Sequence, residues 1–371
     1  MTKPVTKVVL VGSMPPALGS DEEAMSLALA EVGPDLRAAL PPGETGEVER
    51  NWIVGVIRKL RNNPTLAVTR NGNWDNFNDP LNFKIRSGQQ FTSDTLDLAL
   101  LSSFQKNWNT FLRLRKEFDL PDLVWQQKVP TEDNWAYFTF GTKGLLWKRY
   151  LRPFVEATAR ELSEIDAIAT AEGEKPLYQI EFPFAYIALV KLAMLHLTAL
   201  QPLATPWAAK QVIRTLTESV PTGARTGGHL CRGNLDGDSL GKPRDTKEMV
   251  KLLNAIFSKW PKGRPHFEYV HLPLTSAKKP PPLYEDFYRP LGKLRLPPGC
   301  DLVAGILHPD LSRTDGLRIL AWIRDLVDAP VHVASTCGYG RCTIPDTKTM
   351  LRLGASMCRP PQPGAGRWTR E

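Results

Sequence analysis

The 371-residue sequence contains no run of eighteen or more apolar residues, the length that a membrane-spanning helix requires. Its most apolar stretch, residues 182–200, is interrupted by Lys191 and His196. The amino-terminal segment MTKPVTKVVLVGS also has too short an apolar run for a secretory signal. We therefore expect a cytoplasmic protein that has no membrane partner.

Cysteine is scarce, and its count is odd. The sequence has five cysteines, namely Cys231, Cys300, Cys337, Cys342 and Cys358. An odd count in a long chain without a secretory signal argues against a framework of disulfides. Thiols that stay reduced in the cytoplasm are able to bind a metal ion, so the positions of these cysteines matter.

Long runs of basic residues and RNA-binding signatures are also absent, although 47 basic and 39 acidic residues give a formal charge of +8. The basic residues are scattered along the chain, and part of the excess lies in the last residues. This distribution predicts that nucleic acid is not a partner. It is compatible with a small-molecule substrate that carries an anionic group.

Hydrophobic residues make up 42% of the chain, which is enough for a large core. From residue 227 onward, short apolar runs typical of strands alternate with segments of helical periodicity. The predicted strands there are Gly227–Leu230, Phe267–His271, Leu302–Leu307 and Val331–Ala334. Strands that alternate with helices form parallel βαβ units. We predict a single (β/α)8 barrel over residues 1–357, followed by a flexible tail over residues 358–371.

Earlier in the chain, two segments are rich in aromatic residues. Residues 71–86 combine them with Asn, Asp and Gly, which predicts an extended loop. Residues 135–140 alternate in a way that predicts a strand. Alternating aromatic residues in a strand favour barrel packing over stacking on a flat ligand.

One set of residues has the composition of a metal site. His229-Leu230-Cys231 ends one predicted strand, and Cys337 follows another. Residues two apart on an extended chain point the same way, and the carboxyl ends of parallel barrel strands converge on one face. An imidazole and two thiolates form a good zinc donor set, with a carboxylate as a possible fourth ligand. Cys342 is a rival ligand to Cys337.

Four short segments resemble, in order, the methionine synthase/uroporphyrinogen decarboxylase-like barrels, and more narrowly the catalytic half of cobalamin-independent methionine synthase. They are Val11-Gly12-Ser13-Met14-Pro15, Tyr178-Gln179-Ile180-Glu181-Phe182-Pro183, His229-Leu230-Cys231 and Val333-Ala334-Ser335-Thr336-Cys337-Gly338. The resemblance covers residues 7–357 and implies a (β/α)8 barrel with a catalytic zinc. The chain has no room for the second, amino-terminal barrel of that synthase, so it resembles the short single-barrel relatives.

The resemblance also implies roles for individual residues. It implies that zinc is held by His229, Cys231 and Cys337, with Glu268 as a fourth ligand. The gap between Cys231 and Glu268 is longer than in the synthase, and His266 and His271 compete for that place. Glu181 stands where the family holds the amino group of the thiol substrate, although the usual Asp-Glu pair is missing. His308 corresponds to a histidine that assists methyl transfer, and Ser13 is a further substrate-binding candidate.

Zinc suits a reaction in which a thiol is the nucleophile, because coordination keeps the thiol deprotonated at neutral pH. The leaving group then requires an acid, and Glu44 and His308 are the candidates. Arg232, beside the metal pair, is a candidate for binding an anionic substrate group. We predict a zinc-dependent methyl- or alkyltransferase that acts on a small-molecule donor and a small thiol. Two alternatives stay open: a metal-free enzyme of the decarboxylase branch that acts on an acidic substrate, and a non-enzymatic zinc- or RNA-binding protein.

Overall fold

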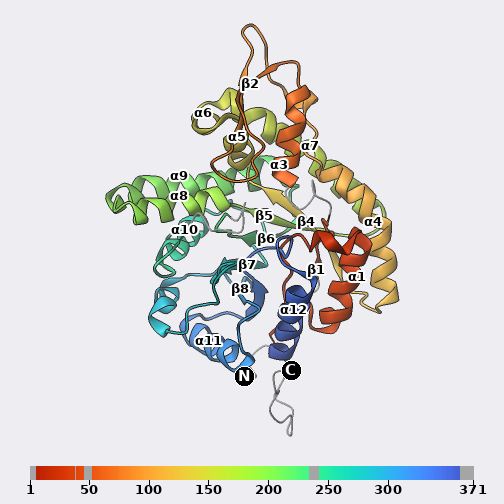
Figure 1. The fold of residues 1–371 in the computed structure, drawn as a ribbon, viewed down its shortest axis with the longest axis vertical. Helices are drawn as coiled ribbons and strands as arrows, with labels where there is room; N and C mark the ends of the chain where they lie inside the picture. The colour runs from red at the N-terminus through yellow and green to blue at the C-terminus, as the bar shows by residue number, and fades with distance from the viewer. Residues whose placement is uncertain (1–5, 38, 46–51, 234–241, 360–371) are drawn as a thin grey trace.

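A computed structural model describes residues 6–37, 39–45, 52–233 and 242–359. Its main sheet contains seven parallel strands in the order β1-β4-β5-β6-β7-β8-β9 (Figure 1). The strands are β1 Ala39–Leu40, β4 Val124–Pro130, β5 Leu177–Glu181, β6 Arg225–His229, β7 Tyr269–Pro273, β8 Asp301–Leu307 and β9 Val331–Ser335. Figure 1 shows that this sheet curls around a central axis.

An extended segment near the amino terminus closes the ring. Val8 forms parallel bridges with Leu36, just before β1, and with Val333 in β9. The backbone N–H of Val9 donates to the carbonyl of Val333 at 2.8 Å, and the N–H of Arg37 donates to the carbonyl of Val8 at 2.8 Å. The segment around Val8 and the seven strands therefore make an eight-stranded parallel barrel, as the alternation in the sequence predicts.

Helices connect most of the strands and cover the outside of the barrel (Figure 1). They are α1 Asp21–Val32, α3 Trp52–Lys59, α4 Leu100–Glu117, α5 Glu132–Phe140, α6 Thr142–Leu146, α7 Lys148–Ala171, α8 Pro183–Met194, α9 Gln201–Arg214, α10 Lys247–Ser258, α11 Arg313–Leu326 and α12 Ile344–Cys358. Ser20, Ser312 and Thr343 cap their helices with side-chain oxygens. In the described part of the chain, none of the helices combines the length and apolar character needed to cross a bilayer.

Between β1 and β4 the chain adds a unit that is not part of the barrel repeat. After α3 it forms an antiparallel hairpin of β2 Leu66–Asn71 and β3 Leu81–Ile85. The loop predicted over residues 71–86 is therefore wrong, because this polar stretch includes the second strand of the hairpin. In Figure 1 the hairpin stands at the top of the molecule, and its residues line a cavity together with residues that follow β6 and β9.

The strand predicted over residues 135–140 is also wrong, because these residues form most of helix α5. Glu132 and Asp133 lie in the first turn, where negative charge favours a helix, and Gly141 ends the helix with a positive φ of 62°. The aromatic side chains of the segment therefore follow helical spacing. Trp135 is fully buried, whereas Tyr137 and Phe138 face a cavity described below.

The start of helix α4 is capped by a residue from another helix. Its preceding residue, Ala99, has no side chain that can accept a hydrogen bond. Glu161 of α7 instead accepts from the backbone N–H groups of Leu98, Leu100 and Leu101, at 2.7, 2.9 and 3.2 Å. This buried carboxylate satisfies donors that would otherwise lack a partner at a helix start.

We expect Glu161→Ala to lower the free energy of unfolding by about 2 kcal/mol, because it leaves several buried N–H groups without an acceptor. Glu161→Gln retains one acceptor oxygen and should cost less. Urea denaturation followed by circular dichroism measures both. Equal stability of Glu161→Ala and the unchanged protein would contradict the capping role.

Candidate metal centre

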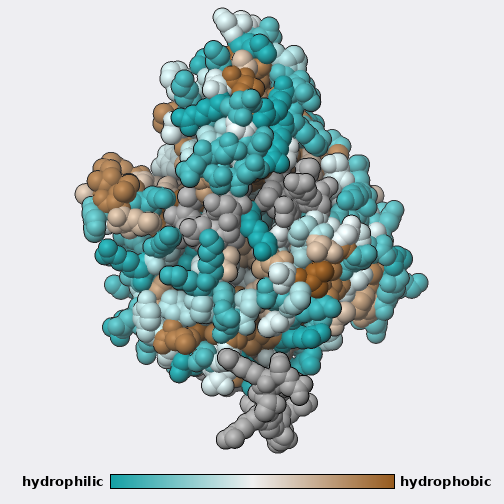
Figure 2. Space-filling model, viewed as in Figure 1, coloured by the Kyte–Doolittle hydropathy of each residue, from teal (hydrophilic) through white to brown (hydrophobic). Residues whose placement is uncertain are grey.

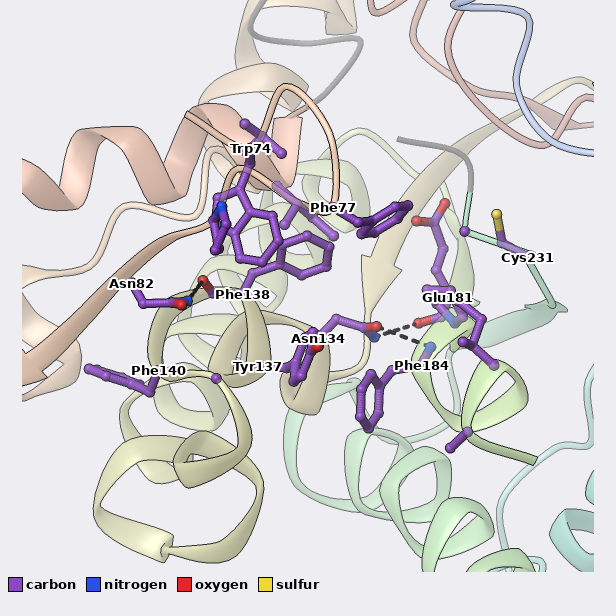
Figure 3. A pocket seen from close by; sticks show the side chains of 18 of the residues that line it. Trp74, Phe77, Asn82, Asn134, Tyr137, Phe138, Phe140, Glu181, Phe184 and Cys231 are labelled. Atoms are coloured by element: carbon purple, nitrogen blue, oxygen red, sulfur yellow. Dashed lines mark hydrogen bonds between the residues drawn. The ribbon is translucent and has the colours of Figure 1, made fainter. Parts of the chain in front are cut away.

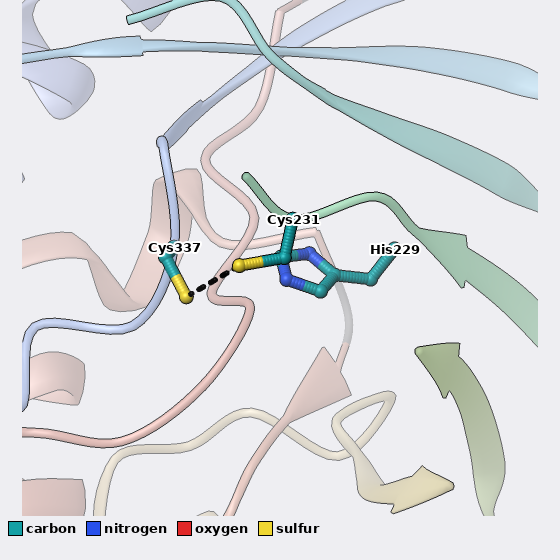
Figure 4. A group of neighbouring side chains, drawn as sticks. All are labelled: His229, Cys231 and Cys337. Carbon is teal, nitrogen blue, oxygen red and sulfur yellow. Dashed lines mark hydrogen bonds between the residues drawn. The ribbon is translucent and has the colours of Figure 1, made fainter. Parts of the chain in front are cut away.

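His229, Cys231 and Cys337 meet at the carboxyl end of the barrel. His229 is the last residue of β6, Cys231 lies two residues beyond it, and Cys337 lies two residues beyond the end of β9. One ligand atom from each residue lies within 4.8 Å of the others. The Sγ atoms of Cys231 and Cys337 are 3.6 Å apart (Figure 4). Two thiolates bound to one tetrahedral zinc ion lie about 3.8 Å apart, so the spacing suits that ion.

The surroundings of His229 also suit a metal ligand. Its side chain is buried, and its Nδ1 atom has no hydrogen-bond partner. A buried polar atom without a partner is costly, and a bound cation would remove that cost. The neighbouring His271 stacks on His229 with ring centroids 4.7 Å apart. The ring nitrogens of His271 face the carbonyls of Leu230 and Ser335 at 3.3 and 2.9 Å, so His271 is already satisfied.

A hydrogen bond between the two cysteines shifts their pKa values in opposite directions. The Sγ of Cys231 donates to the Sγ of Cys337, and this hydrogen bond raises the pKa of Cys231. The same bond lowers the pKa of Cys337 well below its ordinary value, helped by a hydrogen bond from His229. The positive charge of Arg341 lowers it further. A thiolate at Cys337 is the form that binds a metal.

Close backbone packing fixes the position of Cys337. A Cβ atom on Gly338 would lie 2.5 Å from the backbone nitrogen of Ser13, so only glycine fits there. The backbone N–H of Tyr339 donates to the carbonyl of Ser13 at 2.5 Å. The loop after the first barrel strand therefore holds the loop after the last one. Ser13 lies at the wall of the cavity above the cysteines.

Two carboxylates and a lysine lie beside the cysteines. Glu181 ends β5, and burial raises the pKa of its carboxyl, against the lowering effects of His229 and Lys128. Glu44 follows β1 and is 3% exposed. It forms a buried ion pair with Lys128 of β4. Burial raises the pKa of Glu44 to about 7, although the charge of Lys128 opposes the rise.

A cavity of about 960 Å³ opens above this group. Its floor includes Glu44, Glu181, His229, Cys231 and Cys337. Its outer wall is aromatic and comes from the β2–β3 hairpin, α5 and α8, with Trp74, Phe77, Tyr137, Phe138 and Phe184. Figure 3 shows Trp74, Phe77 and Phe138 on one side of the cavity, with Glu181 and Cys231 on the other. Basic side chains also line it, namely Arg70, Lys84, Lys143, Lys191 and Arg341.

The structure does not bring Glu268 to the metal residues. Strand β7 begins at Tyr269, so Glu268 lies before the strand, at the opposite end of the barrel. There its carboxylate pairs with Arg225 at 2.6 and 3.0 Å and with Arg37 at 3.5 Å. The prediction of Glu268 as a ligand is corrected, because its carboxylate lies at the amino end of β7, away from His229, Cys231 and Cys337 at the carboxyl end of the barrel.

Two further candidates lie away from the cavity wall. His308 follows β8, and its Nδ1 accepts from the backbone N–H of Asp310 at 3.2 Å, while burial lowers its pKa. Arg232 donates from Nε to the carbonyl of Pro273 at 2.9 Å. Neither residue lines the cavity. Cys342, the rival ligand, is outside the group of three, and burial raises its pKa to about 11.

Sequence reasoning missed Lys128 and Arg341. Lys128 is the one charged residue of the largely buried strand β4, and a buried lysine is a signal for a functional side chain. The sequence pattern predicts a strand over Asp122–Gln126, which ends before Lys128 and so left this residue out. Arg341 follows the Cys337-Gly338 turn, where a basic residue beside a thiol is a recognisable signal.

Comparison with solved structures identifies the fold. A B12-independent methionine synthase from Shewanella sp. W3-18-1, solved in complex with selenomethionine, matches 96% of this chain and 97% of its own, with a TM-score of 0.58 and 11% identity. The fold is that of B12-independent methionine synthase. A Listeria monocytogenes protein described as a vitamin-B12-independent methionine synthase matches 94% of this chain and 95% of its own, with a TM-score of 0.51 and 11% identity. No family model and no curated protein sequence matches.

Because Glu268 pairs with arginines at the far end of the barrel, we expect Glu268→Ala to leave the metal content of the purified protein unchanged. The lost ion pairs are partly exposed, so the free energy of unfolding should fall by only about 1 kcal/mol. Metal analysis of the purified variant and thermal denaturation measure the two effects. A lower metal content in this variant would indicate that Glu268 is a metal ligand after all.

Proposed function

We propose that this chain is a zinc-dependent transferase that moves a methyl or other alkyl group from a small-molecule donor to a small thiol. The observation that carries the proposal is the meeting of His229, Cys231 and Cys337 at the carboxyl end of a barrel with the methionine synthase fold. In barrels of this kind, that end is where catalytic sites are built. A cavity large enough for two substrates opens directly above these residues.

The ligand count supports catalysis over a purely structural metal. Among the described residues the group contains three ligands, and Glu268 lies elsewhere. Structural zinc sites have four protein ligands, whereas catalytic sites keep one position open. When bound, zinc would supply the positive charge that keeps an acceptor thiol deprotonated.

The charged residues around the site support an acceptor that carries an amino group. Glu181 lies near enough to His229 and Lys128 for both to lower the pKa of its carboxyl, and it lines the cavity. A cationic amine beside it would offset the cost of burying its negative charge. The Shewanella methionine synthase holds selenomethionine, which is an amino acid. Glu181 would then orient the acceptor so that its sulfur points toward the metal.

The aromatic wall supports a donor with a flat ring system. Trp74 and Phe138 lie edge to face with ring centroids 4.9 Å apart, and Tyr137 and Phe184 lie 4.7 Å apart. Such rings offer faces and edges on which a planar group stacks. The leaving group requires a proton, and Glu44 is the carboxyl on the cavity floor whose pKa lies near neutrality.

We expect Cys337→Ser to lower zinc affinity by more than about 100-fold and to abolish transfer, because a serine hydroxyl is not deprotonated at neutral pH. The matched control is Cys342→Ser, five residues away and outside the group of three. Zinc per chain and the rate of alkylation of a thiol such as homocysteine measure the effects. Full zinc retention in Cys337→Ser would refute the proposed ligand set.

Glu44 as the acid predicts a rate that falls as pH rises through about 7, where its carboxyl loses its proton. Glu44→Gln should lower turnover about 100-fold or more and remove this step from the pH profile. Lys128→Met removes the charge that lowers the pKa of Glu44, so the step should move to higher pH. An unmoved step in Lys128→Met would assign it to another group.

A further inference from the structure

The tip of the hairpin formed by α8 and α9 exposes an unusual number of large apolar side chains. Leu195 is 63% exposed and Leu203 is 76% exposed. Met194, Leu197 and Leu200 are exposed as well. Figure 1 shows this hairpin projecting from the body, and Figure 2 shows the hydrophobic patch at its end. Exposed apolar clusters of this kind mark interaction surfaces.

A second apolar projection lies at the junction of α6 and α7. Leu146 is 77% exposed and Trp147 is 55% exposed. The guanidinium of Arg149 lies over the Trp147 ring, 5.3 Å from its centroid. The two projections flank one cavity, because Lys143 of α6 and Lys191 of α8 both line it.

Both projections lie in segments that contain no acidic residue. Residues 134–155 and 182–217 hold no Asp or Glu, whereas the chain as a whole has 39 in 371 residues. At that average, about six acidic residues would fall in these two segments. The same segments contain basic residues for which the structure gives no ion pair among the described residues, namely Lys143, Lys148, Arg149, Lys191 and Lys210.

We propose that these two projections dock the enzyme on an anionic lipid surface, with the mouth of the cavity turned toward the lipid. Apolar tips next to unpaired basic residues are typical of interfacial anchors, because the tips enter the acyl boundary while the cations remain among the headgroups. A second copy of the chain would bring like charges together. The tips are convex, which suits a deformable lipid surface better than a rigid protein surface. This proposal departs from the sequence-based expectation of no membrane partner.

The proposal is independent of the metal centre, because none of the docking residues belongs to the group of three. Cosedimentation with vesicles tests it in the full-length protein. Vesicles of phosphatidylcholine are compared with vesicles that also contain phosphatidylglycerol. We expect binding to the anionic vesicles that weakens as salt increases. Cys337→Ser should bind as the unchanged protein does, so failure of the transferase proposal and failure of this one are distinguishable.

Leu195→Glu/Leu203→Glu should lower the partition coefficient by about tenfold or more, because two apolar anchors become charged. The matched control is Leu283→Glu/Tyr284→Glu, which adds the same charge at two exposed apolar residues between β7 and β8. Thermal denaturation checks that both variants are folded. Sedimentation equilibrium checks for self-association.

Three outcomes would overturn the proposal. The first is protein that stays in the supernatant with both kinds of vesicle. The second is equal binding of the two double variants, which would make binding a matter of net charge alone. The third is a dimer that dissociates in Leu195→Glu/Leu203→Glu while vesicles bind nothing, which would assign the surface to a second copy.

Discussion

The closure of the barrel around Val8 is the constraint on which the site depends. Val8 bridges Leu36 at one end of the sheet and Val333 at the other, so the carboxyl ends of all the strands surround one space. Residues far apart in sequence, such as Cys231 and Cys337, then meet with their sulfurs 3.6 Å apart. Without closure, β6 and β9 would lie in an open sheet with two strands between them. The close contact between Gly338 and Ser13 also depends on closure, because it joins the loop after the first barrel strand to the loop after the last one.

Two buried carboxylates, Glu44 and Glu161, have different roles because their surroundings differ. Glu44 and Glu161 are both buried carboxylates, and burial raises the pKa of each. Glu161 accepts three backbone hydrogen bonds and serves structure. Glu44 has a lysine as its partner and faces a cavity, so its proton is available to a ligand. Position in the fold, more than residue type, separates the two roles.

The sequence was sufficient to predict the barrel, and it also singled out three residues that the structure brings together, His229, Cys231 and Cys337. The alternation of strands and helices is local, and His229 and Cys231 stand two apart at a strand end. Glu268 was misplaced because it precedes Tyr269, the first residue of β7, and even in the predicted strand it is the second residue, whereas the metal residues lie at the carboxyl ends of their strands. Lys128 was missed because its strand extends four residues beyond the predicted end. The aromatic residues 135–140 were predicted to pack as a strand, but they form helix α5, which directs Tyr137 and Phe138 into the cavity. The sequence could not show this cavity, because it depends on where the β2–β3 hairpin lies.

The β2–β3 hairpin can change in sequence during evolution without disturbing the barrel. It supplies much of the wall of the cavity, yet it is inserted between β1 and β4 and contributes nothing to the closed ring of strands. Substitutions, insertions or deletions there can reshape the cavity while His229, Cys231 and Cys337 stay in place. Because the hairpin and the barrel strands are separate parts of the fold, the shape of the cavity can change during evolution while the residues at the strand ends are kept.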